Sequence, residues 1–172
     1  MTDSVTTTAA PTHLAATVAR LVGAISASHY PAGDRAALRR WAPGQPLPLA
    51  FYRLWLRHVA EDLPHPAQTE AWMLIAWSIA TLGSAGHDPS RPWGQALAEK
   101  KFAEGRLERL LAAPQDIRAD LFMSAIRFLA TKGGSFDLTE AARFLLATDP
   151  AKRDSTHRRL AQAFYRHLPQ ND

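Results

Sequence analysis

Seven histidines are the residues of this sequence with the widest chemical range, because an imidazole binds metal ions and transfers protons near neutral pH. Zinc sites and metalloproteases place such ligands at short, fixed spacings, as in the HExxH pattern on one helix. That pattern is absent, and no two histidines have a metal-ligand spacing on a helix. The spacing favours surface or hydrogen-bonded histidines and predicts neither a metal ion nor any other cofactor.

The other residue types that support catalysis are missing or badly placed. The chain has no cysteine, which excludes disulfides, zinc ribbons and thiol catalysis. No Gly-rich phosphate loop of the Walker type occurs, and Gly133 and Gly134 are typical of a helix end. No serine has a nucleophile-elbow context, and Asp116 and Asp120 are typical of a solvated helix face. The sequence predicts a protein that is not an enzyme and has no small-molecule substrate.

Arginine is the residue type whose placement is uneven. Residues 35–60 contain five arginines and no Asp or Glu, although the whole chain, with 20 Lys and Arg against 16 Asp and Glu, has a net charge of only +4. A segment without carboxylates has cations that are available to a polyanion. The five arginines are Arg35, Arg39, Arg40, Arg53 and Arg57.

A second basic pattern lies near the C-terminus. Lys152, Arg159 and Arg166 recur every seven residues, and seven residues turn a helix by about 700°, so the three side chains share one narrow stripe. Leu160 and Phe164, four residues apart, supply the buried side of the same helix. A single basic stripe is often only solvated surface, but two acid-poor segments in one small domain favour a surface that binds phosphate.

Helices must position these residues, because nearly every segment after Pro11 has helical rather than strand periodicity. The sequence predicts an all-α, single-domain helical bundle of about eight or nine helices over residues 12–168. A disordered lead over 1–11 and a C-terminal tail over 169–172 flank it. The most apolar segment, Trp72–Leu82, is the predicted central helix. The predicted core contains Leu56, Trp72, Ile75, Leu121, Phe128, Leu145 and Phe164.

Spacing also predicts the inward face of two helices. In the helix that Pro48 begins, this face is Leu49, Tyr52, Leu56, Val59 and Leu63. In the helix that Pro114 begins, it is Ile117, Leu121, Ala125, Phe128 and Leu129.

Helix ends have their own sequence signals. Thr12, Asp34 and Asp149 are predicted N-caps, and Asp137 with Glu140 has the spacing of a capping box. The segment Gly83–Pro92 is rich in Gly, Pro and Ser and is predicted to be a mobile loop.

No segment of the sequence predicts a membrane span or an export signal. The longest apolar stretch, around Ala71–Leu82, is too short and too often interrupted by polar residues. The N-terminus, MTDSVTTTAAP, has neither a basic region nor an apolar one. The predicted location is the cytoplasm, with no membrane partner.

Four segments in order along the chain form a recognisable set: GDRAALRRW with AFYRLW (33–55), WGQALAEKKFAEGRLERLLAA (93–113), AIRFLATKGGSFDLTEAARFLL (125–146) and KRDSTHRRLAQAFY (152–165). Together they resemble one known family, the CasB proteins, which form the small subunit of the type I-E CRISPR Cascade complex. The chain differs at Leu138 and near Ala161, where many members have Trp, and at Arg127, where a doubled arginine is common.

The resemblance implies a non-catalytic, nucleic-acid-binding subunit that acts in antiviral defence. In that family two copies stack beside the subunits that hold the guide RNA, so the implied partners are other Cascade subunits and a second copy of this chain. The subunit binds the phosphate backbone of guide RNA and target DNA nonspecifically and stabilises the R-loop, while base pairing reads the sequence. Matching positions imply contacts by Arg39, Arg40, Arg53, Arg106, Arg127, Lys152 and Arg153, and the seven-residue spacing adds Arg159 and Arg166.

Two other interpretations stay open on sequence alone. One is another helical DNA-binding protein, such as a helix-turn-helix regulator, although no short recognition helix follows a tight turn. The other is a helical adaptor or scaffold protein whose basic faces are only solvated surface. Copurification with Cascade subunits and a short RNA would distinguish a CasB protein from both of these alternatives.

Overall fold

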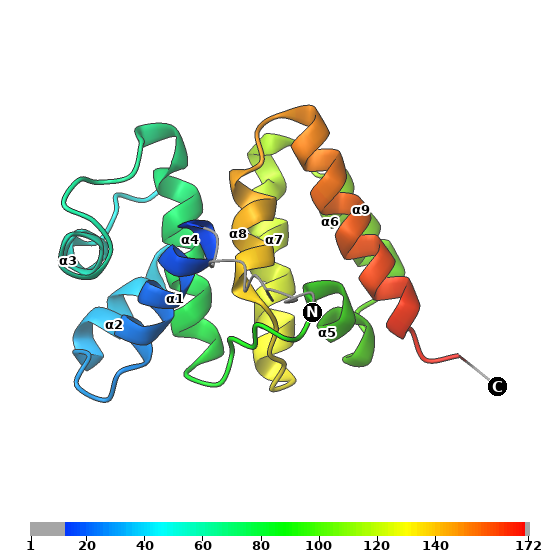
Figure 1. Ribbon diagram of the computed structural model, residues 1–172, viewed down its shortest axis with the longest axis horizontal. Helices are drawn as coiled ribbons and strands as arrows, with labels where there is room; N and C mark the ends of the chain where they lie inside the picture. The colour runs from blue at the N-terminus through cyan, green and yellow to red at the C-terminus, as the bar shows by residue number, and fades with distance from the viewer. Residues whose placement is uncertain (1–12, 171–172) are drawn as a thin grey trace, which may run out of the picture.

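The central element of the fold is α4 (Pro66–Leu82), in agreement with its apolar composition. The computed structural model describes residues 13–170, and within it every residue of α4 from 72 to 80 is buried. The helix packs against α1 (His13–Ser26), α2 (Ala32–Arg40), α7 (Gln115–Thr131) and α8 (Leu138–Leu146) (Figure 1). Residues 72–80 of α4 have no polar face, so other helices must cover this part of the helix on every side.

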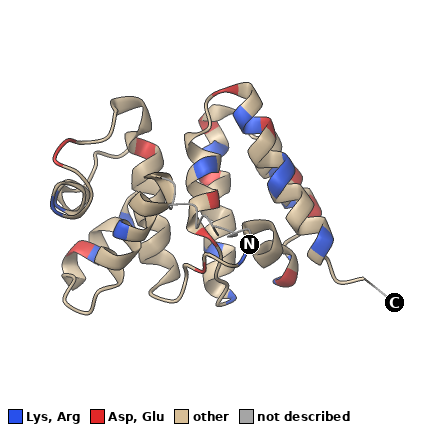
Figure 2. Ribbon diagram, viewed as in Figure 1, with Lys and Arg blue, Asp and Glu red and all other residues tan. Residues whose placement is uncertain are grey.

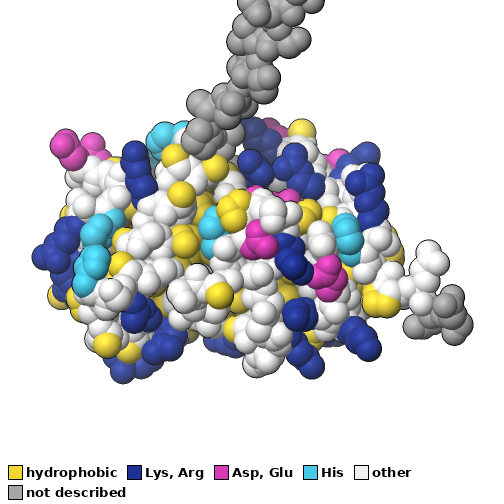
Figure 3. Space-filling model, turned by 60° about the horizontal axis from the view of Figure 1, so that its bottom comes forward, with side chains coloured by type: hydrophobic (Ala, Val, Ile, Leu, Met, Phe, Trp, Pro, Cys, Tyr) yellow, Lys and Arg dark blue, Asp and Glu magenta, His cyan; other side chains and the backbone are white. Residues whose placement is uncertain are grey.

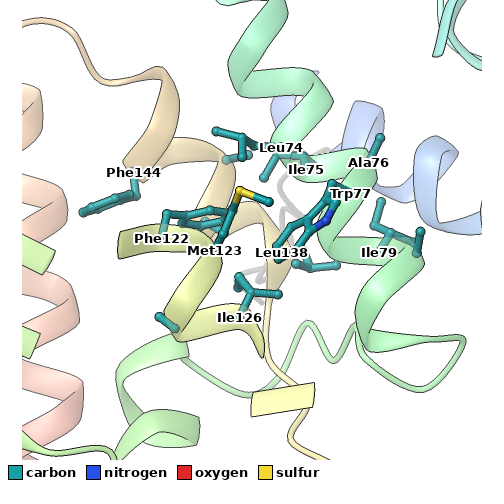
Figure 4. Packing of buried hydrophobic residues seen from close by; sticks show 14 of the residues in the cluster. Leu74, Ile75, Ala76, Trp77, Ile79, Phe122, Met123, Ile126, Leu138 and Phe144 are labelled. Atoms are coloured by element: carbon teal, nitrogen blue, oxygen red, sulfur yellow. The ribbon is translucent and has the colours of Figure 1, made fainter. Parts of the chain in front are cut away.

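The other helices extend the bundle toward the two ends of its long axis (Figure 1). At one end α3 (Leu49–His58) contacts α1 and α2; at the other lie α5 (Trp93–Glu99), α6 (Glu104–Ala112) and α9 (Pro150–His167). Buried residues from every one of these helices form one cluster, and Figure 4 shows its part between α4, α7 and α8. The all-α fold and the expected number of helices are confirmed for residues 13–170. Among these described helices, none is both long enough and apolar enough to span a membrane.

The buried face of α3 is not the predicted one. Leu49 and Leu56, predicted to lie inward, are 70% and 46% exposed. Tyr52 and Val59 are half-buried, and Leu63, beyond the helix, is also exposed. Periodicity could not choose between the two faces, because both repeat at three- and four-residue spacings. Aromatic packing distinguishes them, since the rings of Phe51 and Trp55 lie 6.0 Å apart and Trp55 lies 5.2 Å from Trp72. The face that is buried consists of Ala50, Phe51, Leu54 and Trp55.

The core prediction is correct at its centre and wrong at Leu56. Trp72, Ile75 and Phe164 are buried, as predicted. Leu56 is exposed, as is Ile117, which was predicted to lie on the inward face of its helix, because α3 and α7 turn other faces inward. Leu121, Phe128 and Leu145 are half-buried and pack against the edge of the cluster. The inward side chains of α7 are Arg118, Phe122, Met123, Ala125, Ile126 and Leu129.

The helix N-termini confirm two of the predicted caps. The carboxylate of Asp149 accepts hydrogen bonds from the N–H groups of Ala151 and Lys152, at 2.9 and 3.1 Å. The carboxylate of Asp137 accepts one from the N–H of Thr139 at 2.9 Å. Thr12 lies outside the described residues.

Two other predictions about helix ends are wrong. Asp34 is not an N-cap but lies within the first turn of α2, whose N-cap position is Pro31. The capping box is half-formed, because the N–H of Asp137 donates to the carbonyl of Arg91 at 2.8 Å rather than to Glu140. Both side chains, Asp34 and Glu140, contact other helices instead.

The segment 83–92, predicted to be a mobile loop, is tied to the segment before α8. The N–H of Phe136 donates to the carbonyl of Gly86 at 3.2 Å, and the N–H of Asp88 donates to the carbonyl of Phe136 at 3.0 Å. His87 adds a side-chain contact, since its Nδ1 accepts from the N–H of Leu138 at 3.2 Å. Composition did not reveal this anchoring, because backbone hydrogen bonds rather than apolar burial provide it.

Helices α5 and α9 approach each other closely at Gly94. A Cβ atom at this position would lie 2.2 Å from the carbonyl oxygen of Leu160 and 2.7 Å from the backbone nitrogen of Phe164. Only glycine allows the two backbones to come so near. This contact fixes α9, which carries the predicted basic stripe, against the rest of the bundle.

Candidate nucleic-acid interface

The basic stripe of α9 lies on the surface, with the apolar side of the helix beneath it. Lys152, Arg159 and Arg166 are exposed, whereas Leu160 and Phe164 are buried; Figure 2 shows Lys and Arg along the length of α9. None of the three basic side chains forms an ion pair within residues 13–170. The seven-residue spacing therefore predicted correctly that the three cations share one exposed face.

The neighbouring Arg158 differs from this stripe. Its guanidinium pairs with the carboxylate of Asp154 at 2.7 Å, and both side chains are largely exposed. A pair of this kind on a helix surface adds little to stability. It does partly offset the charge of Arg158, so Arg158 and the stripe residue Arg159 differ in that only Arg158 forms an ion pair among the described residues.

Arg143 of α8 joins the stripe, although the sequence did not single it out. A cleft of about 310 Å³ between α8 and α9 is lined by Arg143, Lys152, Ser155 and Thr156 together with apolar residues. A smaller cavity between the same helices adds Arg159 to the lining. Two cationic side chains and two hydroxyls here can donate hydrogen bonds to an anion. Only the packing of α8 on α9 places Arg143 there, so no local sequence signal could have identified it.

Trp77 brings a second group of predicted residues together from different helices. Its Nε1 donates to the backbone carbonyl of Arg39 at 3.2 Å, and the guanidinium of Arg127 lies over its ring, 5.2 Å from the centroid. The side chains of Arg39, Arg40 and Arg127 are exposed. The C-terminus of α2 and the middle of α7 are therefore linked through one buried indole.

Two predicted contact residues are already engaged by the fold. The guanidinium of Arg53 forms a two-pronged ion pair with the carboxylate of Asp34, at 2.7 and 3.3 Å, which joins α3 to α2. The hydrogen bond with Asp34 raises the pKa of Arg53 and so favours its charged form. Arg106 donates to the hydroxyl of Ser124 at 3.0 Å and lies over the ring of Phe102. Both arginines contribute to packing between helices.

Arg118 is a buried cation that sequence reasoning missed. Its side chain is 4% exposed, donates to the carbonyl of Phe144 at 2.7 Å and lies 3.9 Å over the Phe144 ring. The signal was its spacing, because Arg118 precedes the buried Phe122, Ala125 and Leu129 by four, seven and eleven residues. Burial, and then the nearby charge of Arg153, lower the pKa of Arg118 to about 10.

The buried titratable groups near the middle of the molecule have structural roles. Burial lowers the pKa of His87, which suits a neutral ring whose Nδ1 accepts a hydrogen bond. Burial raises the pKa of Glu140, whose carboxylate accepts from the N–H of Trp93 at 2.9 Å. Within residues 13–170 no three His, Asp or Glu side chains come together in a way that could hold a metal ion.

The basic side chains are distributed over several parts of the surface rather than in one patch. Figure 3 shows Lys and Arg at separate places on one face, with fewer acidic side chains among them. Such a surface suits contact with an extended polyanion at several points and provides no single element for reading bases. Within residues 13–170 the protein is therefore an all-helical domain with a basic surface.

Comparison with known proteins identifies the family. The family model for the CRISPR-associated protein Cse2 matches residues 34–165. The chain therefore belongs to the CRISPR-associated Cse2 family, which is the non-catalytic small subunit, CasB, of the type I-E Cascade complex. This confirms the resemblance seen in the sequence and decides against a helix-turn-helix regulator and against an unrelated adaptor or scaffold protein.

A solved structure supports the fold assignment. The crystal structure of TTHB189, a CRISPR-associated protein of the Cse2 family from Thermus thermophilus, superposes with a TM-score of 0.67. The two chains are 24% identical, and the match covers 88% of this chain and 95% of that chain. No curated protein matches the sequence significantly.

Proposed function

We propose that this chain binds the phosphate backbone of guide RNA and target DNA nonspecifically, and so stabilises the R-loop of a type I-E Cascade complex in the cytoplasm. The observation that carries the proposal is the exposed stripe of Lys152, Arg159 and Arg166, none of which forms an ion pair within residues 13–170. Unpaired cations on a rigid helix attract phosphates and release counterions when they bind.

The proposed contact residues come from three parts of the surface. Arg53 and Arg106 carry less weight, because Asp34 and Ser124 already hold their guanidinium groups. The main set consists of Arg39, Arg40, Arg127, Arg143, Lys152, Arg153, Arg159 and Arg166.

A matched pair of neighbouring substitutions tests the stripe. The logarithm of the affinity for single-stranded DNA should fall linearly with that of salt, with a slope of about −0.7 per phosphate contact. Arg159→Ala should flatten this slope by roughly 0.7 for every DNA sequence. Arg158→Ala, on the same helix but paired with Asp154, should leave it nearly unchanged. Equal effects of the two substitutions would mean that only net charge matters.

The assembled complex provides the functional measurement. Two variants are compared with wild type: Arg39→Ala with Arg40→Ala, and the triple Ala substitution of Lys152, Arg159 and Arg166. Complexes with either variant should assemble normally but hold the R-loop for a shorter time. A loss that depends on base sequence would indicate a protein that reads bases. Wild-type R-loop lifetimes in both variants would show that these residues are only solvated surface.

Absence of catalysis is part of the proposal. The chain has no cysteine, and the partly buried Glu140 and His87 accept hydrogen bonds from backbone N–H groups at the starts of helices. The purified protein is therefore expected neither to cleave nucleic acid nor to hydrolyse ATP. Nuclease or ATPase activity that changes with point substitutions in this chain would contradict this expectation.

The partners proposed for the chain include other Cascade subunits and a second copy of itself. Leu49 and Leu56 make an exposed apolar surface on α3, beside the exposed Arg57. A groove of about 620 Å³ between α6 and α9 is lined by Leu107, Leu111, Ala112, Ala161 and Tyr165, and by the acidic Glu104 and Glu108. The two surfaces lie at opposite ends of the bundle (Figure 1), and their charges are complementary, which supports head-to-tail stacking.

Leu56→Glu tests this contact, because it places a carboxylate opposite an acidic groove. Complexes that contain it should hold fewer copies of this chain, as counted by native mass spectrometry. Ile117→Glu is the control, since Ile117 is similarly exposed (43% against 46%) but lies on α7. An unchanged copy number with Leu56→Glu would exclude α3 from the contact between copies.

A further inference from the structure

Arg118 is a buried cation for which the described residues provide no counter-charge. Only 4% of the residue is exposed, and no carboxylate lies within ion-pair distance of it. The Nη2 atom of its guanidinium donates to the carbonyl of Phe144, whereas the Nη1 atom is buried without a hydrogen-bond partner. A buried charge without a partner is costly, so it calls for an anion from outside the chain.

Two further groups near Arg118 increase the local positive potential. After burial, the charge of Arg153 is the second cause that lowers the pKa of Arg118. Burial first, and then the charges of Arg118 and Arg153, lower the pKa of His157, whose Nε2 is buried without a hydrogen bond. Asp154 acts on His157 in the opposite direction, but its carboxylate pairs with Arg158 on the surface. Three groups that carry or accept a positive charge therefore lie near one another, and within residues 13–170 none of them forms an ion pair with a carboxylate.

A cleft gives access to this cluster. Its volume is about 230 Å³, whereas a single water needs roughly 10–15 Å³. Arg118 and Arg153 both line it, and Gln115 and Thr148 add uncharged hydrogen-bonding side chains. The walls come from α4, α7, the end of α8, the connection after it and the first turn of α9, and each of these four helices has residues in the hydrophobic cluster. The site is thus formed before a ligand arrives.

We propose that this cleft is a binding pocket for a phosphate group, held by the guanidinium groups of Arg118 and Arg153 and by the side chains of Gln115 and Thr148. Guanidinium groups bind phosphate oxygens in a forked geometry, and the hydroxyl and the amide N–H of the lining residues donate to the same oxygens. The phosphate is either free inorganic phosphate or one phosphate of a nucleic-acid strand. The second case rests on the proposed function and would give the subunit one fixed phosphate site besides its open basic surface.

Glu70 is the group in the chain that could compete with this anion. It also lines the cleft, but its side chain is exposed and forms no ion pair. Its carboxylate repels phosphate, so Glu70→Gln should strengthen phosphate binding. If Glu70 were instead the resident counter-ion of Arg118, the same substitution would destabilise the protein and leave it insensitive to phosphate.

Inorganic phosphate is the first probe. The melting temperature of the full chain is measured in phosphate and in chloride at equal ionic strength, because a ligand that binds the folded state raises it. Wild type should be stabilised by phosphate, and Arg118→Met and Arg153→Gln should each weaken phosphate binding about tenfold or more, as expected for lost hydrogen bonds to a charged group. Arg158→Gln, on the same helix as Arg153, should behave as wild type.

The pKa of His157 gives an independent readout. A bound phosphate favours the imidazolium, so NMR titration should show the pKa of His157 higher in phosphate than in chloride. Arg153→Gln should abolish this difference. Should Arg118→Met fail to fold, Arg153→Gln still decides the matter, because Arg153 lies at the surface side of the cleft and is only half-buried. No phosphate-dependent change in wild type, or an equal change in Arg153→Gln, would overturn the pocket.

Single-stranded DNA then separates this pocket from the proposed function. If Arg118→Met and Arg159→Ala both weaken DNA binding, the pocket holds a backbone phosphate and the surface stripe also binds. If only Arg118→Met loses the response to inorganic phosphate while both variants bind DNA as wild type does, the pocket holds free phosphate and the proposed stripe function fails. If only Arg159→Ala weakens DNA binding and phosphate has no effect, the stripe function stands and the pocket is refuted.

Discussion

The carboxylate of Glu140 on α8 accepts a hydrogen bond from the backbone N–H of Trp93, the first residue of α5, at 2.9 Å. The two residues are 47 positions apart in the chain. Helices usually satisfy such an N–H with a side chain from the residue just before the helix. Here Pro92 occupies that position and makes no cap, so a second helix supplies the acceptor and the two N-termini are fixed together.

Removing this acceptor should destabilise the protein. Glu140→Ala leaves the N–H of Trp93 without a partner and should lower the free energy of unfolding by about 1–2 kcal/mol. Glu140→Gln keeps an oxygen acceptor and avoids burying a charge, so it should remain close to wild type. Urea denaturation measures both values, with the exposed Glu108→Ala as a surface control. A Gln variant as unstable as the Ala variant would mean that the charge, not the hydrogen bond, matters.

Gly94 and Gly105 should respond oppositely to the same substitution. Gly94→Ala forces a methyl group against the backbone of α9 at 2.2 Å and should cost about 1–3 kcal/mol or more. Gly105 lies in α6 with nothing within 4 Å of an added Cβ, so Gly105→Ala should stabilise the protein by about 0.4–1 kcal/mol. Thermal unfolding of both variants tests the pair. A neutral Gly94→Ala would show that α9 can move away from α5 without loss.

Burial on α7 and α3 predicts a large difference between two apolar truncations. Phe122 is fully buried and its ring lies 5.7 Å from that of Trp93, so Phe122→Ala should cost about 3–5 kcal/mol. Leu56 is 46% exposed, so Leu56→Ala should change stability by about 0.5 kcal/mol or less. Denaturant titration of the isolated chain provides the comparison. A large loss of stability in Leu56→Ala would indicate that the face of α3 predicted from the sequence is the buried one.

The neutral form of His87 should make stability fall in mild acid. Burial lowers its pKa below the ordinary value of 6.5, so the unfolded chain takes up a proton at a higher pH than the folded protein does. The contribution of His87 is therefore complete above about pH 6.5 and is lost as the pH falls from there through the lowered folded pKa. His87→Asn keeps an acceptor for Leu138 and cannot be protonated, so unfolding curves should show a weaker pH dependence between about pH 7 and 5. An unchanged dependence would assign the effect to His157, whose pKa is shifted in the same direction.

The sequence predicted best those features that one helix determines by itself. The stripe of Lys152, Arg159 and Arg166 follows from spacing alone, as does the cap at Asp149, and both are present in the structure. The central helix α4 was equally clear, because only a buried helix has so few polar residues. These features depend on local chemistry and need no knowledge of neighbouring elements.

Features that depend on contacts between distant helices were missed. On α3 two apolar faces had equal periodicity, and the position of Trp72 on another helix determined which one is buried. Arg53 lies in a segment (35–60) without Asp or Glu, which suggested that its charge was unpaired. In the structure it forms an ion pair with Asp34 of α2, just before that segment. The position of Arg143 beside α9 likewise arises only when helices pack. One sequence cannot specify such pairings, because local periodicity carries no information about them.

The close approach of α5 and α9 at Gly94 has a consequence for synthesis on the ribosome. Helices α1 and α2 pack on α4, and α3 packs on α1 and α2, so these contacts can form while the rest of the chain is still being translated, before α7 and α8 cover the other side of α4. The partners that cover Trp93 and α5 are made last, since Glu140, Phe144 and all of α9 follow them. A nascent chain that stalls before Leu160 would therefore leave an apolar surface of α5 uncovered even when α4 already has all its partners.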